Sequence, residues 1–160
     1  PKFDYIQGRI FSFFNRETGT HNFQSDKAIE SITSGGFFGK GIGEGVLKNR
    51  VPEAHTDYII SVISEEFGVV AIMLILLLFL ILIYMVFKKI SFETNDKVKL
   101  ILIGSISLIL MQATIHIGVN IRLFPTTGMT LPFLSYGGSS IISTSILAGI
   151  ILNLTKRKIT

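Results

Sequence analysis

Three long uncharged stretches divide the chain. Residues 68–87 carry no charge, residues 100–119 contain His116 as their only ionisable group, and residues 131–155 are again uncharged. A helix of about 20 apolar residues crosses the roughly 30 Å hydrocarbon core of a bilayer. The pattern therefore predicts an all-α polytopic membrane protein whose transmembrane helices cover residues 68–87, 100–119 and 136–155.

The composition agrees with this prediction and excludes two other classes of protein. Hydrophobic residues make up 48% of the 160 residues and charged residues only 16%, with a mean hydropathy of +0.56. Soluble domains usually carry about 25% charged residues, so a soluble globular fold is excluded. The chain has no cysteine, which excludes a disulfide-stapled secreted domain.

The basic residues predict how the chain crosses the membrane. The segment 120–135 contains one basic residue, Arg122, and residues 1–58 are neutral overall, with seven basic and seven acidic residues. Residues 88–99 and 156–160 carry the excess of basic residues: Lys88, Lys89, Lys97, Lys99, Lys156, Arg157 and Lys158. Lysine and arginine are enriched in cytoplasmic loops. We therefore expect 88–99 and 156–160 to be cytoplasmic, and 1–67 and 120–135 to lie outside. Nucleic acid is not an expected partner despite the net charge of +4, because these charges do not form one face.

The outer segment begins at Pro1 without a signal-peptide pattern, so we expect the chain to be the C-terminal part of a longer membrane protein. Residues 22–34 have the apolar spacing of a short amphipathic helix that ends at Gly35. Residues 35–45 are rich in glycine but lack the Gly-Lys-Ser/Thr ending of a phosphate-binding loop. They predict a turn-rich loop with positive φ angles, or a loop that brings backbone close to a ligand.

Residues 51–68 combine carboxylates with the start of the first apolar run. Pro52 suits the first turn of a helix, and Glu53 and Asp57 would complement the positive end of its dipole. Asp57 is therefore a candidate site residue between water and lipid. The alternative is that Asp57 only caps the helix, while the other carboxylates are solvated interface charges: Glu53, Glu65 and Glu66.

Residues 125–140 hold two prolines and three glycines, too many for an unbroken helix. We expect residues 131–138 to form a broken or re-entrant segment that leads into the third transmembrane helix, because irregular backbone at membrane depth must be satisfied by protein or enclosed water. Arg122 and His116 lie near the outer end of the second apolar run. Arg122 is a functional candidate or reaches to lipid headgroups, and His116 is a functional candidate or hydrogen-bonds across helices.

Two motifs carry a resemblance to a known family. They are PEAHTDY at residues 52–58, followed by EEFG at 65–68, and GMTLPFLSYGGSS at 128–140. Both resemble signatures of the SEDS membrane proteins of bacterial cell-wall synthesis, and weaker matches lie at residues 9–15, 24–29 and 34–39. Thr130 resembles the cell-division member of the family rather than the elongation member, which typically has proline there. Tyr58 departs mildly from the phenylalanine that is common at its position.

The resemblance implies a peptidoglycan glycosyltransferase in the bacterial inner membrane, at the division septum. Its substrate would be lipid II, a disaccharide pentapeptide on undecaprenyl pyrophosphate, and its partners a class B penicillin-binding protein and other divisome membrane proteins. The family's essential aspartate maps onto Asp57, which could act as the base for a sugar hydroxyl. The candidate substrate-binding residues are Glu53, His55, Lys40, Lys48, Arg50, Arg122, Ser135, Tyr136 and Gly137. No cofactor is certain, and a divalent cation, Mg²⁺ or Mn²⁺, is a candidate for the pyrophosphate.

Other functions remain open at this point. A broken helix and a polar Arg122 would also suit a transporter that flips lipid II across the membrane. A non-catalytic division scaffold would not need the chemistry of Asp57, and the elongation member of the family would share most of these motifs.

Overall fold

The computed structural model describes residues 20–51 and 53–156, and within these ranges the regular structure is entirely helical. The helices are α2 (Thr20–Gly35), α3 (Leu47–Arg50), α4 (Ile59–Phe92), α5 (Asp96–Asn120) and α6 (Gly138–Thr155). The weak sequence matches at residues 9–15 and the basic residues Arg157 and Lys158 lie outside the described part. The helical architecture confirms the predicted all-α class.

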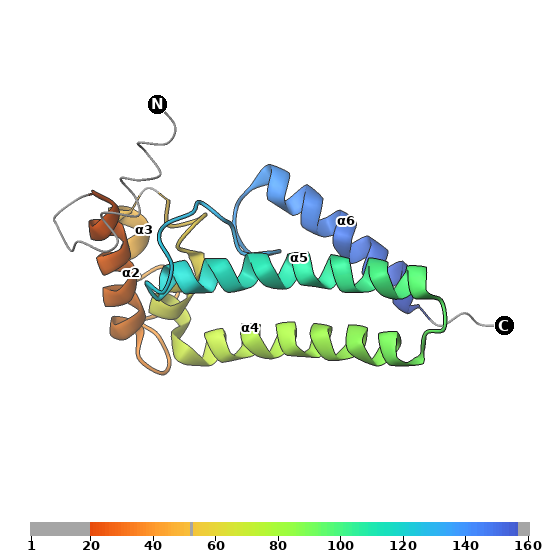
Figure 1. Ribbon diagram of the computed structural model, residues 1–160. Helices are drawn as coiled ribbons and strands as arrows, with labels where there is room; N and C mark the ends of the chain where they lie inside the picture. Colours follow the sequence, from red (N-terminus) through yellow and green to blue (C-terminus); the bar gives the residue numbers. More distant parts are fainter. Residues whose placement is uncertain (1–19, 52, 157–160) are drawn as a thin grey trace, which may run out of the picture.

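Three of these helices are long and apolar enough to cross a membrane. The most apolar windows of α4, α5 and α6 have mean hydropathies of 3.4, 2.0 and 1.5. In Figure 1, α4 and α5 run side by side as an antiparallel pair, α6 leans against α5, and α2 and α3 gather at one end of the bundle. The fold is therefore a membrane helix bundle that carries a small helical cap. The side of the membrane on which each loop lies stays a prediction.

The three long helices pack through branched aliphatic side chains. One cluster joins residues of α4, α5 and α6: Val86, Leu102, Ile106, Ile109 and Ile151. Gln112 of α5 also donates from Nε2 to the Thr130 carbonyl and to Ser140 Oγ, both at 2.9 Å. In lipid, such packing and interhelical hydrogen bonds hold helices together.

The helix α4 breaks at Gly68, which has φ 75° and ψ −174°. A break leaves backbone carbonyls before it and N–H groups after it without helical partners. The glycine-rich loop supplies those partners: Lys40 N and Gly41 N donate to the carbonyls of Glu65 and Glu66 (2.9 and 3.1 Å), and Val69 N and Val70 N donate to those of Gly36 and Phe37 (3.0 and 3.4 Å). Positive φ angles at Gly36, Gly39, Gly41 and Gly43 confirm the predicted loop conformation. These glycines allow the backbone of the loop to approach α4 closely.

The prediction of a helix that starts at Pro52 is wrong for the described residues that follow it. Pro52 itself lies outside the described part, and residues 53–58 form turns, so α4 begins only at Ile59. The Glu53 carbonyl accepts from the N–H groups of Thr56, Asp57 and Tyr58, which closes a tight turn rather than a continuing helix. Glu53 and Asp57 are consequently not in the first turn of α4.

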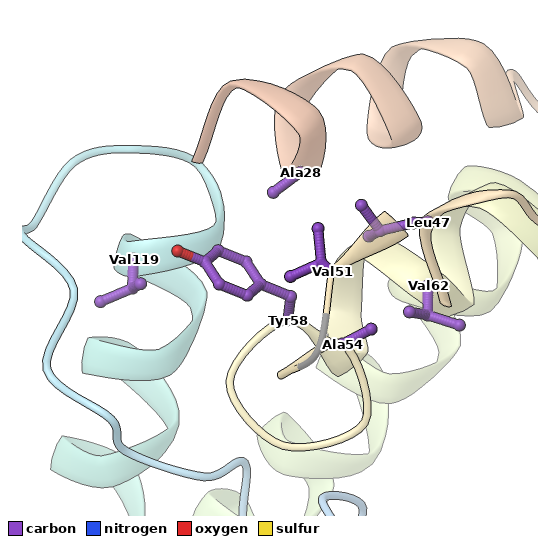
Figure 2. Packing of buried hydrophobic residues seen from close by; sticks show 7 residues of the cluster. All are labelled: Ala28, Leu47, Val51, Ala54, Tyr58, Val62 and Val119. Atoms are coloured by element: carbon purple, nitrogen blue, oxygen red, sulfur yellow. The ribbon is translucent and has the colours of Figure 1, made fainter. Parts of the chain in front are cut away.

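The turn is anchored by Tyr58, whose side chain is 1% exposed. Figure 2 shows the Tyr58 ring among apolar side chains from α2, α3, the following turn and the ends of α4 and α5: Ala28, Leu47, Val51, Ala54, Val62 and Val119. The helix predicted over 22–34 is confirmed as α2, and its Ala28 faces this cluster. The cluster ties the cap to the bundle beside Asp57.

Candidate functional site

Asp57 lies in the turn of residues 53–58, between the end of α5 and the segment 128–137. Its side chain is partly buried. The Asp57 carboxylate faces Gly128, because a Cβ added to that glycine would lie 3.7 Å from Asp57 Oδ2. Gly128 has φ 71°, a conformation that favours glycine. The backbone just before the predicted re-entrant segment therefore passes close to the carboxylate.

The re-entrant segment is fastened to the Asp57 turn by hydrogen bonds. Ser135 Oγ donates to the Thr56 carbonyl at 2.7 Å, and the N–H of Tyr136 donates to the His55 carbonyl at 3.1 Å. Gly137 is the extended residue before α6, and the side chains of Tyr136 and His55 are exposed. The structure thus brings six of the predicted site residues to one place: Asp57, Glu53, His55, Ser135, Tyr136 and Gly137.

The end of α5 contacts the same turn through residues that the motifs did not single out. Asn120 Nδ2 donates to the Asp57 carbonyl at 2.8 Å, and Asn120 Oδ1 accepts from Ser61 Oγ at 2.7 Å. His116 Nε2 lies 3.3 Å from the Thr56 carbonyl, so this contact of His116 is to the turn before α4 rather than to another helix. One sequence feature could have pointed to Asn120: it is an amide directly after an apolar run. A buried amide needs hydrogen-bond partners.

The predicted cations do not surround Asp57 as one group. Lys40 and Arg50 line a separate polar pocket of about 150 Å³ between α2, the glycine-rich loop and α3, together with Lys27, Glu30 and Glu65. A hydrogen bond from Lys27 and its positive charge hold the pKa of the Glu30 carboxyl below its ordinary value of 4.5. The side chain of Lys48 lies outside the described part of the structure.

The burial of Glu65 contradicts the alternative that Glu53, Glu65 and Glu66 are all solvated interface charges. Its side chain is 3% exposed, and it accepts from Lys40 Nζ at 2.8 Å and from the backbone N–H of Leu47 at 3.0 Å. A buried carboxylate requires such partners. Glu65 therefore joins α4 to the loop and to α3.

Arg122 lies apart from the polar pocket. It has φ 60°, and its guanidinium pairs with Asp26 of α2. This ion pair links the segment after α5 to the cap. Any contact of Arg122 with a substrate would have to compete with Asp26.

An apolar groove of about 320 Å³ lies between α4 and the re-entrant segment. Only apolar side chains line it: Leu74, Ile75, Leu78, Phe79, Leu82, Pro132, Phe133 and Leu134. Leu134 directly precedes Ser135, which contacts the Asp57 turn. The same short segment therefore borders the groove and contacts the Asp57 turn.

Within residues 20–51 and 53–156, no three His, Asp or Glu side chains come close enough to share a metal ion. Mg²⁺ usually binds through one or two carboxylates plus substrate phosphates, so a cation brought by the pyrophosphate stays a prediction.

Comparisons with known proteins agree with the resemblance in the motifs. The pattern of the FtsW/RodA/SpoVE family, described as "Cell cycle protein", matches residues 2–159. Two relatives are each named "Probable peptidoglycan glycosyltransferase FtsW". The protein from Enterococcus hirae is 38% identical over 160 residues, and the protein from Caulobacter vibrioides is 39% identical over 158 residues. In both cases the match covers 98% of this chain and 40% of the relative, so the chain spans less than half of the relatives' length.

A solved structure is also similar. It is described as "Structural coordination of polymerization and crosslinking by a peptidoglycan synthase complex" and aligns with a TM-score of 0.69 and 28% identity over 94% of this chain and 41% of its own. The family pattern, the relatives and this structure agree in covering nearly the whole chain. The chain therefore belongs to the FtsW/RodA/SpoVE family of cell cycle proteins, and it is part of a multi-pass membrane protein.

Proposed function

We propose that the full-length protein is a peptidoglycan glycosyltransferase that polymerises lipid II during septal cell-wall synthesis, with Asp57 as its general base. The observation that carries the proposal is the position of Asp57. A partly buried carboxylate lies on a turn held by two other elements, and one of them also borders an apolar groove. The names of the relatives, which describe peptidoglycan glycosyltransferases, support the same reaction.

The chemistry of glycan polymerisation suits a single carboxylate. The acceptor sugar hydroxyl attacks the anomeric carbon of the donor, a glycosidic C–O bond forms, and the bond from that carbon to the pyrophosphate oxygen breaks. The hydroxyl proton passes to the Asp57 carboxylate, and the bonding electron pair leaves with the pyrophosphate. A positioned base contributes about 10²- to 10⁴-fold in rate.

The leaving group and the lipid tail also need partners. Positive charge stabilises the departing pyrophosphate. Arg50 can supply that charge if it reaches the substrate in the full-length protein. Lys40 can do so on leaving Glu65, and Arg122 on leaving Asp26. The apolar groove between α4 and residues 132–134 could take part of the undecaprenyl chain.

The test is glycan polymerisation by the full-length protein with its class B penicillin-binding partner and labelled lipid II. Asp57→Asn preserves size and hydrogen bonding but cannot accept a proton at neutral pH, so we expect it to lower the rate at least about 100-fold. Glu44→Gln is the matched control, because Glu44 is an exposed carboxylate of the glycine-rich loop. An Asp57→Asn protein that polymerises like the wild type contradicts the base assignment. A wild type that makes no glycan but moves lipid II across vesicles supports the flippase instead.

The septal part of the proposal depends on Thr130 and on relatives that share the name FtsW. Depletion of the full-length protein should leave cells filamentous and undivided. Rounded cells that still divide would indicate the elongation member of the family, and a normal septal glycan yield with Asp57→Asn would favour a scaffold.

A further inference from the structure

We propose that Ser135 and Asn120 are positioning residues for Asp57, because they hold the two peptide groups that flank it and so set the direction of the Cα–Cβ bond that carries its carboxylate. This inference rests on the proposed function of Asp57 as the base. It assigns a role to two buried polar side chains that lie far from the turn in sequence.

The peptide group before Asp57 is held from two sides. Its carbonyl, which belongs to Thr56, accepts from Ser135 Oγ at 2.7 Å and has His116 Nε2 at 3.3 Å. Its N–H, which belongs to Asp57, donates to the Glu53 carbonyl at 3.0 Å. The plane of this peptide is therefore fixed by the re-entrant segment, by α5 and by the turn itself.

The peptide group after Asp57 is held by α5. Its carbonyl accepts from Asn120 Nδ2 at 2.8 Å. Because peptide groups are planar, fixing the two planes on either side of Asp57 fixes φ and ψ of that residue. The direction of its Cα–Cβ bond follows, and the carboxylate extends from that bond.

Ser135 and Asn120 are themselves oriented by further hydrogen bonds. Ser135 Oγ accepts from the backbone N–H of Leu131 at 2.8 Å, so its own proton is directed to the Thr56 carbonyl. Asn120 Oδ1 accepts from Ser61 N at 3.2 Å and Ser61 Oγ at 2.7 Å, which turns its amide nitrogen toward Asp57. Ser135 is 3% exposed and Asn120 is fully buried, so water does not compete for these contacts.

The expected consequence is a loss of turnover rather than of substrate binding. Neither side chain is a proton acceptor for the reaction, and both act through the backbone of the turn. Displacing a catalytic group by about 1 Å can cost about 100-fold in rate. We expect Ser135→Ala and Asn120→Ser each to lower kcat by about 10- to 100-fold, with KM for lipid II changed by no more than about twofold.

Gln112→Ala is the matched control. Gln112 also joins α5 to the segment 128–140, through hydrogen bonds to the Thr130 carbonyl, Thr130 Oγ1 and Ser140 Oγ, and none of these bonds is to the Asp57 turn. If loosening of the segment were the cause of the effect, this variant would reproduce it. We expect Gln112→Ala to lower thermal stability as Ser135→Ala does, while keeping kcat within about twofold of the wild type.

The experiment measures kcat and KM for lipid II with the full-length protein and its penicillin-binding partner. A selective drop in kcat for Ser135→Ala, recovered by Ser135→Thr because the hydroxyl returns, supports the inference. Asn120→Ser provides an independent measurement if Ser135→Ala does not fold. Unchanged kcat in Ser135→Ala or, where that variant does not fold, in Asn120→Ser overturns the inference, as does an equal kcat loss in Gln112→Ala. A wild type that makes no glycan overturns the proposed function and this inference together, whereas an active wild type with unaffected variants overturns this inference alone.

Discussion

Replacing Gly68 by alanine tests how the break in α4 is held. Gly68 has φ 75° and ψ −174°, a region of backbone conformation that is essentially reserved for glycine. A Cβ there would also lie 2.2 Å from the Phe37 carbonyl oxygen and 2.5 Å from Gly39 N. These atoms belong to the backbone of the loop, which cannot turn aside as a flexible side chain does. The loop must therefore move away from α4.

The size of the effect follows from these two contributions. The strained conformation costs about 1 to 3 kcal/mol for a residue with a side chain. Moving the loop breaks the bonds from Val69 N to the Gly36 carbonyl and from Val70 N to the Phe37 carbonyl, at about 1 kcal/mol each. We expect Gly68→Ala to lower the free energy of unfolding of the cap by about 3 to 5 kcal/mol.

The assay is thermal melting of the purified full-length protein in detergent, followed by size-exclusion chromatography. Gly36→Ala is the matched control, because Gly36 also has a positive φ of 57° but a Cβ added there would meet no other atom within 4 Å. It should carry only the conformational cost, about 1 to 2 kcal/mol. Equal melting temperatures for Gly68→Ala and Gly36→Ala would refute the argument that the loop is pressed against the break.

Three further predictions concern charges and topology. Lys40→Met leaves the Glu65 carboxylate buried without its cation and should destabilise the protein by about 1 to 3 kcal/mol, and adding Glu65→Gln should restore part of that loss in thermal melts. Arg122→Ala should raise KM for lipid II if Arg122 leaves Asp26 to bind pyrophosphate; an unchanged KM with a lower melting temperature would indicate a structural ion pair only. Single cysteines at Thr33 and Ser91 should differ in intact spheroplasts, because we expect an impermeant thiol reagent to label Thr33→Cys alone; labelling of Ser91→Cys alone would reverse the topology.

Local pattern and family resemblance identified only some of the residues that build the site. The motifs selected Asp57, Ser135, Tyr136 and Gly137, and the structure places these residues together. They did not select Asn120, whose two hydrogen-bonding groups reach the Asp57 carbonyl and Ser61. Its role depends on how the end of α5 docks against a turn about 60 residues earlier, and no local spacing encodes such a contact.

The sequence by itself determined the membrane helices and the glycine-rich loop. Length and continuous hydrophobicity are sufficient for a bilayer-spanning helix, because in lipid every backbone group must be satisfied within the helix. Glycine likewise favours positive φ because it lacks Cβ, which is a local property, and four glycines of the loop adopt such angles. These features depend on neighbours in the chain, so they can be recognised without knowing the fold.

Only the tertiary structure decided where α4 begins and which charges are buried. The carboxylates Glu53 and Glu65 look alike in the sequence, yet Glu53 is exposed and Glu65 is buried against Lys40. The helix α4 begins at Ile59, and not at Pro52 as predicted, because Tyr58 is held in an apolar cluster by residues of α2, α3 and α5. Burial and hydrogen-bond partners arise from packing between distant segments, and that packing is the physical reason why the sequence alone could not place them.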